Sequence, residues 1–420
     1  MLVTDGPLIV VGAGTVGLAI AYHLHQEGMA VTVIDRDPEG DRASHGNAGA
    51  IAVTEVVPAS VPGLAWKVPG WLLDPLGPLA IRPRHAPRLA RWLWAFARAG
   101  RPAEVARIAA ALSALNSRVY DDLIPMLTAT GLIGELHRSG ALTVYESRKA
   151  FAADSAAWEL KRRHGIEMEM LGRAEALALE PALGPIVACG VFTPQWSHIS
   201  DPRHLVSALR TWLQAAGVVV MPGEVAAIDG SDPLSVRLRD GRSVTAARVV
   251  VAAGAWSGRL AKGLGDAVLL ESERGYNTTI REPGVTVGRE IIFAERSFVA
   301  TPLSCGLRIG GAAEFGGLAE VADYRRSKAL AKLAARYFPD LRTAGGVEWA
   351  GHRPATPDSL PVIGRASAND RVFYAFGHGH LGLTQAATTG RLIADLLLRR
   401  PTPIDLTPYA VTRFRPLWSG

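Results

Sequence analysis

A glycine triplet follows the apolar run LIVV near the amino terminus, at Gly12, Gly14 and Gly17. In a GxGxxG turn the first glycine permits the tight bend, the second lets a pyrophosphate approach the backbone, and the third lets a helix pack closely on a strand. A second apolar run ends at Asp35, whose carboxylate can accept hydrogen bonds from ribose hydroxyls. Arg36 keeps a phosphate-binding alternative open. The pattern predicts a dinucleotide site, and the triplet serves FAD and NAD alike.

Small residues recur in two further segments. ASHGNAGAI contains Ser44, Asn47, Ala48 and Gly49, whose successive amides can form an anion-binding nest; a solvent-exposed loop is the alternative. The buried strand in VVVAAGAWSG ends in small residues, where a backbone can lie against a flat ligand. From this segment and the strand VAAID, the predicted cofactor contacts are Val225, Ala253 and Gly254.

Two carboxy-terminal segments extend the pattern, GHRPATPDSLPVIG and FGHGHLGLTQAATTGRLIADLL. With the opening turn and SHGNAG, they resemble the D-amino-acid oxidase-like flavoproteins, and more closely the bacterial D-amino-acid dehydrogenases. The resemblance implies FAD as cofactor and an α/β fold with a Rossmann-type FAD-binding domain and a substrate domain of mixed sheet plus helices. ESERGYNTTI and ATPLSCGLRIGGAAEFGG look most like D-hydroxyproline dehydrogenases, which oxidise cis-4-hydroxy-D-proline to a pyrroline carboxylate. Looser forms recur in relatives acting on D-alanine, sarcosine and glycine.

The resemblance also implies roles for single residues. Arg353 is expected to bind the substrate carboxylate with its planar guanidinium, against the alternative of an ion-paired surface arginine. Tyr276 is expected as a second donor to that carboxylate. His378 and His380 are expected to ease deprotonation of the substrate ammonium, to contact a ring substituent, or only to shape their loop.

The predicted helix beginning near Gly382 and Leu383 would aim its free amides at the flavin N1 and C2 carbonyl, where negative charge accumulates on reduction. Thr384 is expected to hydrogen-bond there, and Gly379 to line the cofactor site; simple helix capping is the alternative. His45 lies in the region where some relatives attach flavin covalently, but its surroundings differ, and no covalent bond is predicted.

These elements must be positioned by a chain of 420 residues, which exceeds the usual size of one hydrophobic core. Nucleotide-domain patterns occur at three separated places. We therefore expect an FAD-binding domain from 1–55, 185–260 and 345–420, and a substrate domain from 56–184 and 261–344.

Composition narrows the function classes. Two cysteines without CxxC spacing argue against a zinc site, an iron–sulfur cluster or a disulfide framework. The first apolar run is too short to cross a bilayer, so a cytoplasmic location is expected. The net charge is +6, and the segment from Arg82 to Arg107 carries seven arginines against one acid. A basic amphipathic helix there suits the inner-membrane surface or a partner subunit, whereas a solvated arginine face is the ordinary alternative.

The preferred reading is a dehydrogenase acting on a small D-amino acid or D-hydroxyproline, with no nucleic-acid partner. Its electron acceptor is left open among a quinone, a partner subunit and O2. The alternatives are an oxidase that returns electrons to O2, a catalytically silent flavoprotein subunit, and an NAD-dependent dehydrogenase. The last leaves the carboxy-terminal glycine loop without a role.

Overall fold

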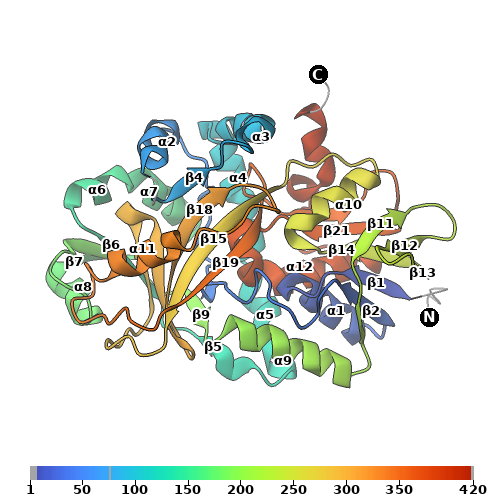
Figure 1. Cartoon of the computed structure of the whole chain (residues 1–420), viewed down its shortest axis with the longest axis horizontal. Helices are drawn as coiled ribbons and strands as arrows, with labels where there is room; N and C mark the ends of the chain where they lie inside the picture. Colours follow the sequence, from blue (N-terminus) through green and yellow to red (C-terminus); the bar gives the residue numbers. More distant parts are fainter. Residues whose placement is uncertain (1–6, 75–76, 418–420) are drawn as a thin grey trace.

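The computed structural model describes residues 7–74 and 77–417. Its strands form two large sheets that lie next to each other along the long axis of the molecule (Figure 1). Segments from both ends of the chain meet in the first sheet, whereas the middle of the chain supplies most of the second.

The first sheet has the strand order β10–β2–β1–β14–β21–β20. Its strands pair in parallel, except that β20 runs antiparallel to β21. Both faces are covered, which explains why β1 is buried along its whole length and reads as a continuous apolar run. The strands span Leu8–Val11 (β1), Val31–Asp35 (β2), Val219–Pro222 (β10), Arg248–Val251 (β14), Val362–Arg365 (β20) and Val372–Phe376 (β21).

Helices share a continuous core with one face of this sheet. They are α1 (Thr15–Gln26), α4 (Pro102–Asn116), α5 (Val119–Ala129), α9 (Pro202–Ala215) and α12 (Gly382–Leu397). The other face packs against α10 (Ser257–Gly263) and a small sheet of β11 (Val225–Asp229), β12 (Ser235–Leu238) and β13 (Ser243–Thr245). α1 and α12 are in direct contact, so the first and last helices of the cofactor domain pack together.

The second sheet has the order β19–β15–β18–β17–β16–β6–β8–β7, with β4 beside β18. Its outer face packs on α11 (Arg325–Ala334) through buried residues that include Leu330 and Ala334. The strands span Leu79–Ile81 (β4), Ala141–Tyr145 (β6), Glu169–Gly172 (β7), Cys189–Thr193 (β8), Glu271–Ile280 (β15), Glu290–Phe293 (β16), Phe298–Leu303 (β17), Gly306–Phe315 (β18) and Val347–Ala355 (β19).

The remaining helices and the second small sheet pack against both large sheets. They are α2 (Leu64–Leu73), α3 (Ala86–Ala99), α6 (Arg148–Ala153), α7 (Ser155–Arg163), α8 (Arg173–Leu179) and a small sheet of β3 (Ala50–Ile51), β9 (Ser197–Ile199) and β5 (Leu136–His137). The arginine-rich segment forms α3, which buries Leu89 and Trp92 but leaves Leu93 and Trp94 exposed. None of the helices described is both long and apolar enough to cross a bilayer.

The sheets divide the chain differently from the predicted domains. β8 and β19 lie in ranges predicted for the FAD-binding domain, yet both pair within the second sheet. Conversely, α4 and α5 fall in the range predicted for the substrate domain but pack on the core of the first sheet. The chain crosses between the sheets several times, and each segment is assigned by distant strand partners that local composition does not reveal.

Candidate active site

The glycine turn between β1 and α1 packs against the end of β14. Gly12 has φ +111°, and a Cβ there would lie 2.5 Å from the Ala252 carbonyl oxygen. A Cβ on Gly17 would lie 1.9 Å from the Gly12 oxygen, whereas one on Gly14 would meet only Ser44 Oγ at 3.4 Å. The first and third glycines are therefore needed for packing within the protein, and the second leaves its backbone open to a ligand.

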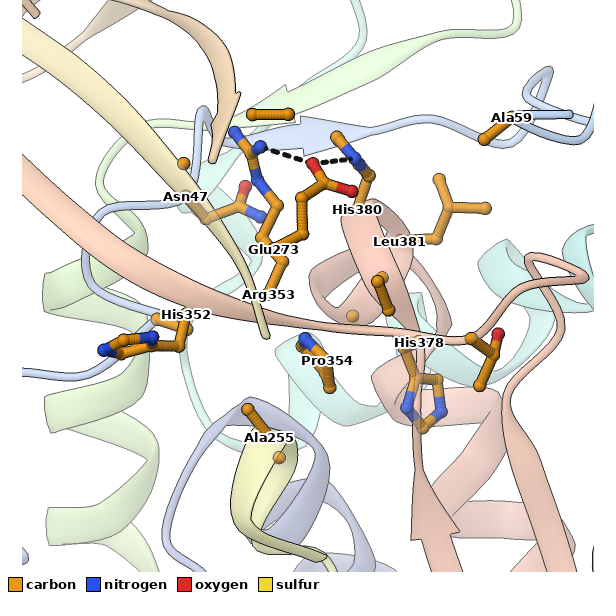
Figure 2. A pocket seen from close by; sticks show the side chains of 18 of the residues that line it. Asn47, Ala59, Ala255, Glu273, His352, Arg353, Pro354, His378, His380 and Leu381 are labelled. Carbon is orange, nitrogen blue, oxygen red and sulfur yellow. Dashed lines mark hydrogen bonds and ion pairs between the residues drawn. The ribbon is translucent and has the colours of Figure 1, made fainter. Parts of the chain in front are cut away.

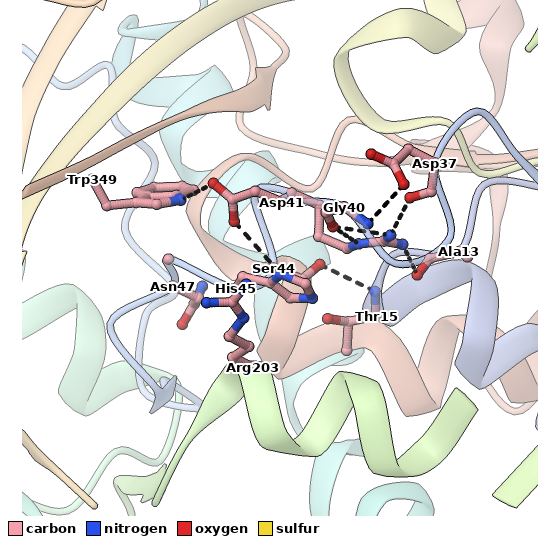
Figure 3. A network of polar contacts seen from close by, with 12 residues as sticks. Ala13, Thr15, Asp37, Gly40, Asp41, Ser44, His45, Asn47, Arg203 and Trp349 are labelled. Atoms are coloured by element: carbon pink, nitrogen blue, oxygen red, sulfur yellow. Dashed lines mark hydrogen bonds and ion pairs between the residues drawn. The ribbon is translucent and has the colours of Figure 1, made fainter. Parts of the chain in front are cut away.

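The loop after β2 folds back over this turn (Figure 3). Arg42 donates through Nη1 to the Ala13 oxygen at 2.5 Å and through Nη2 to the Asp37 oxygen at 2.6 Å. Ser44 Oγ accepts a hydrogen bond from the Thr15 amide at 3.1 Å, at the start of α1. Sequence reasoning overlooked Arg42, because an arginine in a polar loop carries no pattern of its own.

The second sheet holds the same loop from the other side. Trp349 on β19 donates from Nε1 to Asp41 Oδ2 at 2.5 Å, and its ring lies where a Cβ on Gly46 would be, 2.2 Å from Cδ2. Arg308 on β18 donates from Nη1 to the Asn47 oxygen at 2.6 Å. The predicted nest is therefore fastened by both sheets.

The carboxyl end of β2 lies at one end of the cavity. Asp35 Oδ2 accepts from the Ala13 amide at 2.7 Å and its Oδ1 from the Asp37 amide at 3.0 Å, so this carboxylate shapes the turn as well as lining the cavity. The Arg36 guanidinium stacks on Trp256 with its carbon 3.7 Å from the ring centroid. Other predicted residues that line the cavity here are Val225, Ala253 and Gly254.

The start of α12 lies at the other end of the cavity. The helix begins at Gly382, as the sequence predicted, and the predicted cofactor contacts lining the cavity in this region are Ala48, Gly379, Gly382 and Leu383. Thr384 differs from prediction: its hydroxyl donates to the Ala50 oxygen and accepts from the Ala52 amide, and it is buried away from the cavity lining. Gly49 likewise packs against Ile199, with its carbonyl accepting that amide at 2.8 Å.

Three titratable side chains meet in the cavity beside the start of α12 (Figure 2). Glu273 Oε1 on β15 accepts from Arg353 Nη1 at 2.9 Å and lies 2.8 Å from His380 Nε2. Arg353 comes from β19, which pairs with β15. The structure thus brings together two predicted residues, Arg353 and His380, and adds Glu273, which sequence reasoning missed.

A β-bulge shapes the strand floor beside this cluster. The β15–β18 register shifts between Gly275 and Tyr276, and the extra residue, Ala312, has φ +55°. Its carbonyl accepts from Arg353 Nη1 at 3.3 Å. Gly275 leaves room for the guanidinium, since a Cβ there would lie 2.3 Å from Arg353 Cζ. Bulges often re-aim groups at active sites, and this one fixes where the Arg353 guanidinium lies.

Two predicted catalytic residues, Tyr276 and His378, line the cavity but have polar groups hydrogen-bonded outside it. The Tyr276 hydroxyl donates to Glu314 Oε1 and accepts from the Asp323 amide, both at 3.1 Å, and neither partner lines the cavity. His378 is buried, with Nε2 3.0 Å from Thr389 Oγ1, and burial lowers its pKa to about 3. The carboxylate contact of Tyr276 stays a prediction, and the His378 imidazole, held to Thr389, fits the predicted alternative of shaping its loop.

A second acidic group that sequence reasoning missed lies on β16. Glu290 is buried, lines the cavity and accepts from Trp196 Nε1 at 3.1 Å. Burial, and to a lesser degree the charge of Glu55, raises its pKa to about 8. Glu55 itself is paired with Lys161. Glu290 begins the strand EIIF, and a single acid in such a strand does not by itself predict that its side chain faces a cavity.

The cavity that these groups line has a volume of about 1320 Å³ and is bounded by both sheets. Among known protein families, the model described as FAD dependent oxidoreductase matches residues 7–396. The chain belongs to this family. A D-amino-acid oxidase of Bradyrhizobium diazoefficiens is 35% identical to this oxidoreductase, covering 96% of this chain and 98% of its own. A protein named D-amino acid dehydrogenase 2, of Ralstonia nicotianae, is 33% identical over 97% and 100% of the two chains.

Solved structures agree on the fold. The oxidoreductase is similar to glycine oxidase from Geobacillus kaustophilus, with TM-score 0.74, 22% identity and coverage of 97% and 99% of the two chains. It is also similar to L-proline dehydrogenase from P. horikoshii, with TM-score 0.71, 18% identity and coverage of 98% of each chain. The predicted two-domain α/β fold is confirmed.

FAD is the cofactor of this family, and the site fits it. The glycine turn excludes a Cβ at two positions and has none at Gly14, so a pyrophosphate can approach the backbone at the start of α1. The cavity is larger than a single drug-sized ligand needs, so a dinucleotide and a small substrate can share it. The residues around Gly14 and Ser44 would hold the pyrophosphate, Asp35 the ribose, and the start of α12 the flavin pyrimidine.

Proposed function

We propose that this oxidoreductase is a dehydrogenase that oxidises a D-amino acid by hydride transfer from Cα to flavin N5. The preferred substrate is cis-4-hydroxy-D-proline or D-proline. Bound FAD would supply the hydride acceptor. The observation that carries the proposal is the Arg353 guanidinium in the cavity beside Glu273 and His380, next to the start of α12.

Arg353 is the residue that would bind the substrate carboxylate. Its planar fork offers paired donors, and only Nη1 is hydrogen-bonded among the residues described. The amino terminus of α12 contributes positive potential on the same side of the cavity. The work of the protein is then orientation and electrostatics, since loss of hydride from a neutral amine needs no strong base.

The relatives' names support a D-amino acid as substrate, because both proteins above are at least 33% identical over nearly their whole length. The preference for a proline ring rests on the resemblance of ESERGYNTTI and neighbouring segments to D-hydroxyproline dehydrogenases. The strand floor supports it too: Gly310 lines the cavity without a side chain, and the atom nearest to a Cβ there would be Asn277 Cβ at 3.5 Å, which leaves space for a ring.

The deciding experiment is anaerobic mixing of the purified flavoprotein with a panel of D-amino acids and their L enantiomers. We expect D-proline and cis-4-hydroxy-D-proline to bleach the flavin band fastest. Bleaching by other D-amino acids alone would overturn the ring preference, and bleaching by none would support a silent flavoprotein subunit. Stoichiometric hydrogen peroxide in air without an added acceptor would favour an oxidase.

We propose further that α3 can rest on an anionic membrane surface and bring the cavity near a quinone acceptor. The helix exposes Leu93 (37%) and Trp94 (53%), with the Arg98 guanidinium 4.7 Å from the Trp94 ring centroid. Leu93 and Phe96 also line the cavity, which therefore reaches this helix. Exposed apolar residues beside arginines suit the boundary between headgroups and acyl chains.

A further inference from the structure

Glu273 is an acid beside Arg353, the residue proposed to bind the substrate carboxylate. One oxygen, Oε1, meets both Arg353 Nη1 and His380 Nε2. The other, Oε2, has no hydrogen bond among the described residues, although the side chain lines the cavity and is only 13% exposed. Figure 2 shows the carboxylate between the side chains of Arg353 and His380, with its second oxygen turned toward the side of Leu381.

The charge of this acid is fixed by its neighbours. Burial alone would raise the pKa of Glu273, but His380 and Arg353 together lower it to about 2. Arg353 is therefore already balanced by an anion before any ligand enters. A simple carboxylate approaching the free edge of Arg353 would meet the negative charge of Glu273 as well.

We propose that Glu273 binds the amino nitrogen of the substrate, so that the site selects amino acids over simple carboxylates. This rests on the proposed function for the place of the carboxylate, at Arg353. An N–H of the substrate donates to Oε2 while the carboxylate takes the free donors of Arg353. The carboxylate of the ligand then pairs with Arg353 and its amino nitrogen with Glu273. A ligand without the nitrogen leaves Glu273 without a hydrogen-bond donor from the ligand.

The proposal predicts opposite effects from one substitution. Glu273→Gln keeps the shape but removes the anion, so Arg353 gains an unbalanced positive charge. Simple carboxylates should then bind more tightly, and amino acids less tightly. A role for Glu273 in holding the fold alone would shift the two kinds of ligand in the same direction.

The experiment titrates the holoenzyme anaerobically with two matched pairs, D-proline with tetrahydro-2-furoate and D-alanine with propionate. Affinities come from flavin absorbance changes, or from the concentration dependence of bleaching where the ligand is oxidised. In Glu273→Gln we expect at least ten-fold weaker binding of the amino acid and at least ten-fold tighter binding of its partner. Equal or same-direction changes in both pairs would overturn the proposal.

Glu271→Gln is the matched control. Glu271 lies two residues earlier on β15 and also pairs with a histidine, His85, at 3.0 Å, but it does not line the cavity. Glu271→Gln should leave the affinities for the amino acid and for its matched carboxylate within two-fold of wild type. If wild-type flavin is never bleached, the proposed function fails, yet the equilibrium titrations still compare the ligands and decide the role of Glu273.

Discussion

Arg353 enters the cavity with one nitrogen occupied and the rest of its fork uncommitted among the residues described. Its position depends on local backbone features, namely the glycine at 275 and the bulge carbonyl of Ala312. A lysine would reach the same place with a single charged head and could not form the paired contacts of a guanidinium. The geometry thus makes this residue the strongest test of the carboxylate site.

We predict that Arg353→Ala raises the apparent KM of the best D-amino acid by ten- to a hundred-fold or more. A charged hydrogen bond contributes about 1.5 to 3 kcal/mol, which corresponds to that range. The apparent KM of Arg353→Lys should lie between the values of wild type and Arg353→Ala. Stopped-flow bleaching measures the effect, and the flavin content of both variants should match wild type. Normal turnover by the alanine variant would remove Arg353 from the substrate site.

Glu290 gives a prediction for stability against pH. Its pKa is raised from 4.5 to about 8 in the folded protein, so folding favours the protonated form. The associated stability is complete below about pH 4.5 and is lost as pH rises towards 8, by up to about 1.4 kcal/mol per pH unit.

Glu290→Gln removes this titration while keeping an oxygen for Trp196. We expect the variant to unfold at a higher temperature than wild type at pH 8 and at nearly the same temperature at pH 5. Thermal unfolding of the holoenzyme across that range is the measurement. Parallel curves for the two proteins would mean that the carboxyl is solvated in the folded state.

At the scale of elements, the glycines of the turn between β1 and α1 have different roles: Gly17 is needed for packing, whereas Gly14 is expected to contact the ligand. Gly17→Ala places a Cβ against backbone at 1.9 Å and should destabilise even the flavin-free protein, by several kcal/mol if α1 cannot shift. Gly14→Ala meets only Ser44 Oγ at 3.4 Å. It should leave the unfolding temperature of apoprotein nearly unchanged but weaken FAD binding, measured by flavin fluorescence on titration. Equal losses of apoprotein stability would contradict this division.

Sequence patterns predicted elements better than they predicted the direction of side chains. The glycine turn and the start of α12 were both predicted from the sequence. On β15, however, residues 273, 275 and 277 line the cavity, whereas the polar groups of 274, 276 and 278 bond to β18, Asp323 and α11, although Tyr276 also contributes to the cavity lining. Both sets mix polar and small residues, so alternation did not reveal the inner face. Tyr276 was therefore favoured, and Glu273 was missed.

Thr384 and His378 illustrate a second limit. Both lie in a motif that begins a helix beside the cavity, and proximity in sequence suggested ligand contact. Their hydroxyl and imidazole instead satisfy partners on β3 and within α12, at Ala50, Ala52 and Thr389. Buried polar groups need such partners, and those partners are hundreds of residues away or hidden by the turn of the helix.

At the scale of the molecule, the segment from Arg82 to Arg107, which includes α3, carries seven arginines against one acid, and most of these arginines are exposed. We predict that the protein binds vesicles containing phosphatidylglycerol at low salt and not vesicles of phosphatidylcholine alone. Each basic residue near such a surface contributes about 1 kcal/mol, so Arg98→Glu should reduce binding roughly ten-fold or more. Arg237→Glu on β12, which lies at the right-hand end of the molecule in Figure 1 and away from α3, should change it less than two-fold. Cosedimentation gives both values, and equal effects would contradict a membrane face at α3.

The contact between α1 and α12 has a consequence for biosynthesis. The pocket opens with Gly12 but is completed only by residues 379–383, nearly the whole chain later. A nascent polypeptide on the ribosome therefore has no finished receptor for flavin until almost every codon has been read. We expect cofactor capture to follow translation, and intermediates stalled before the last helix to be colourless.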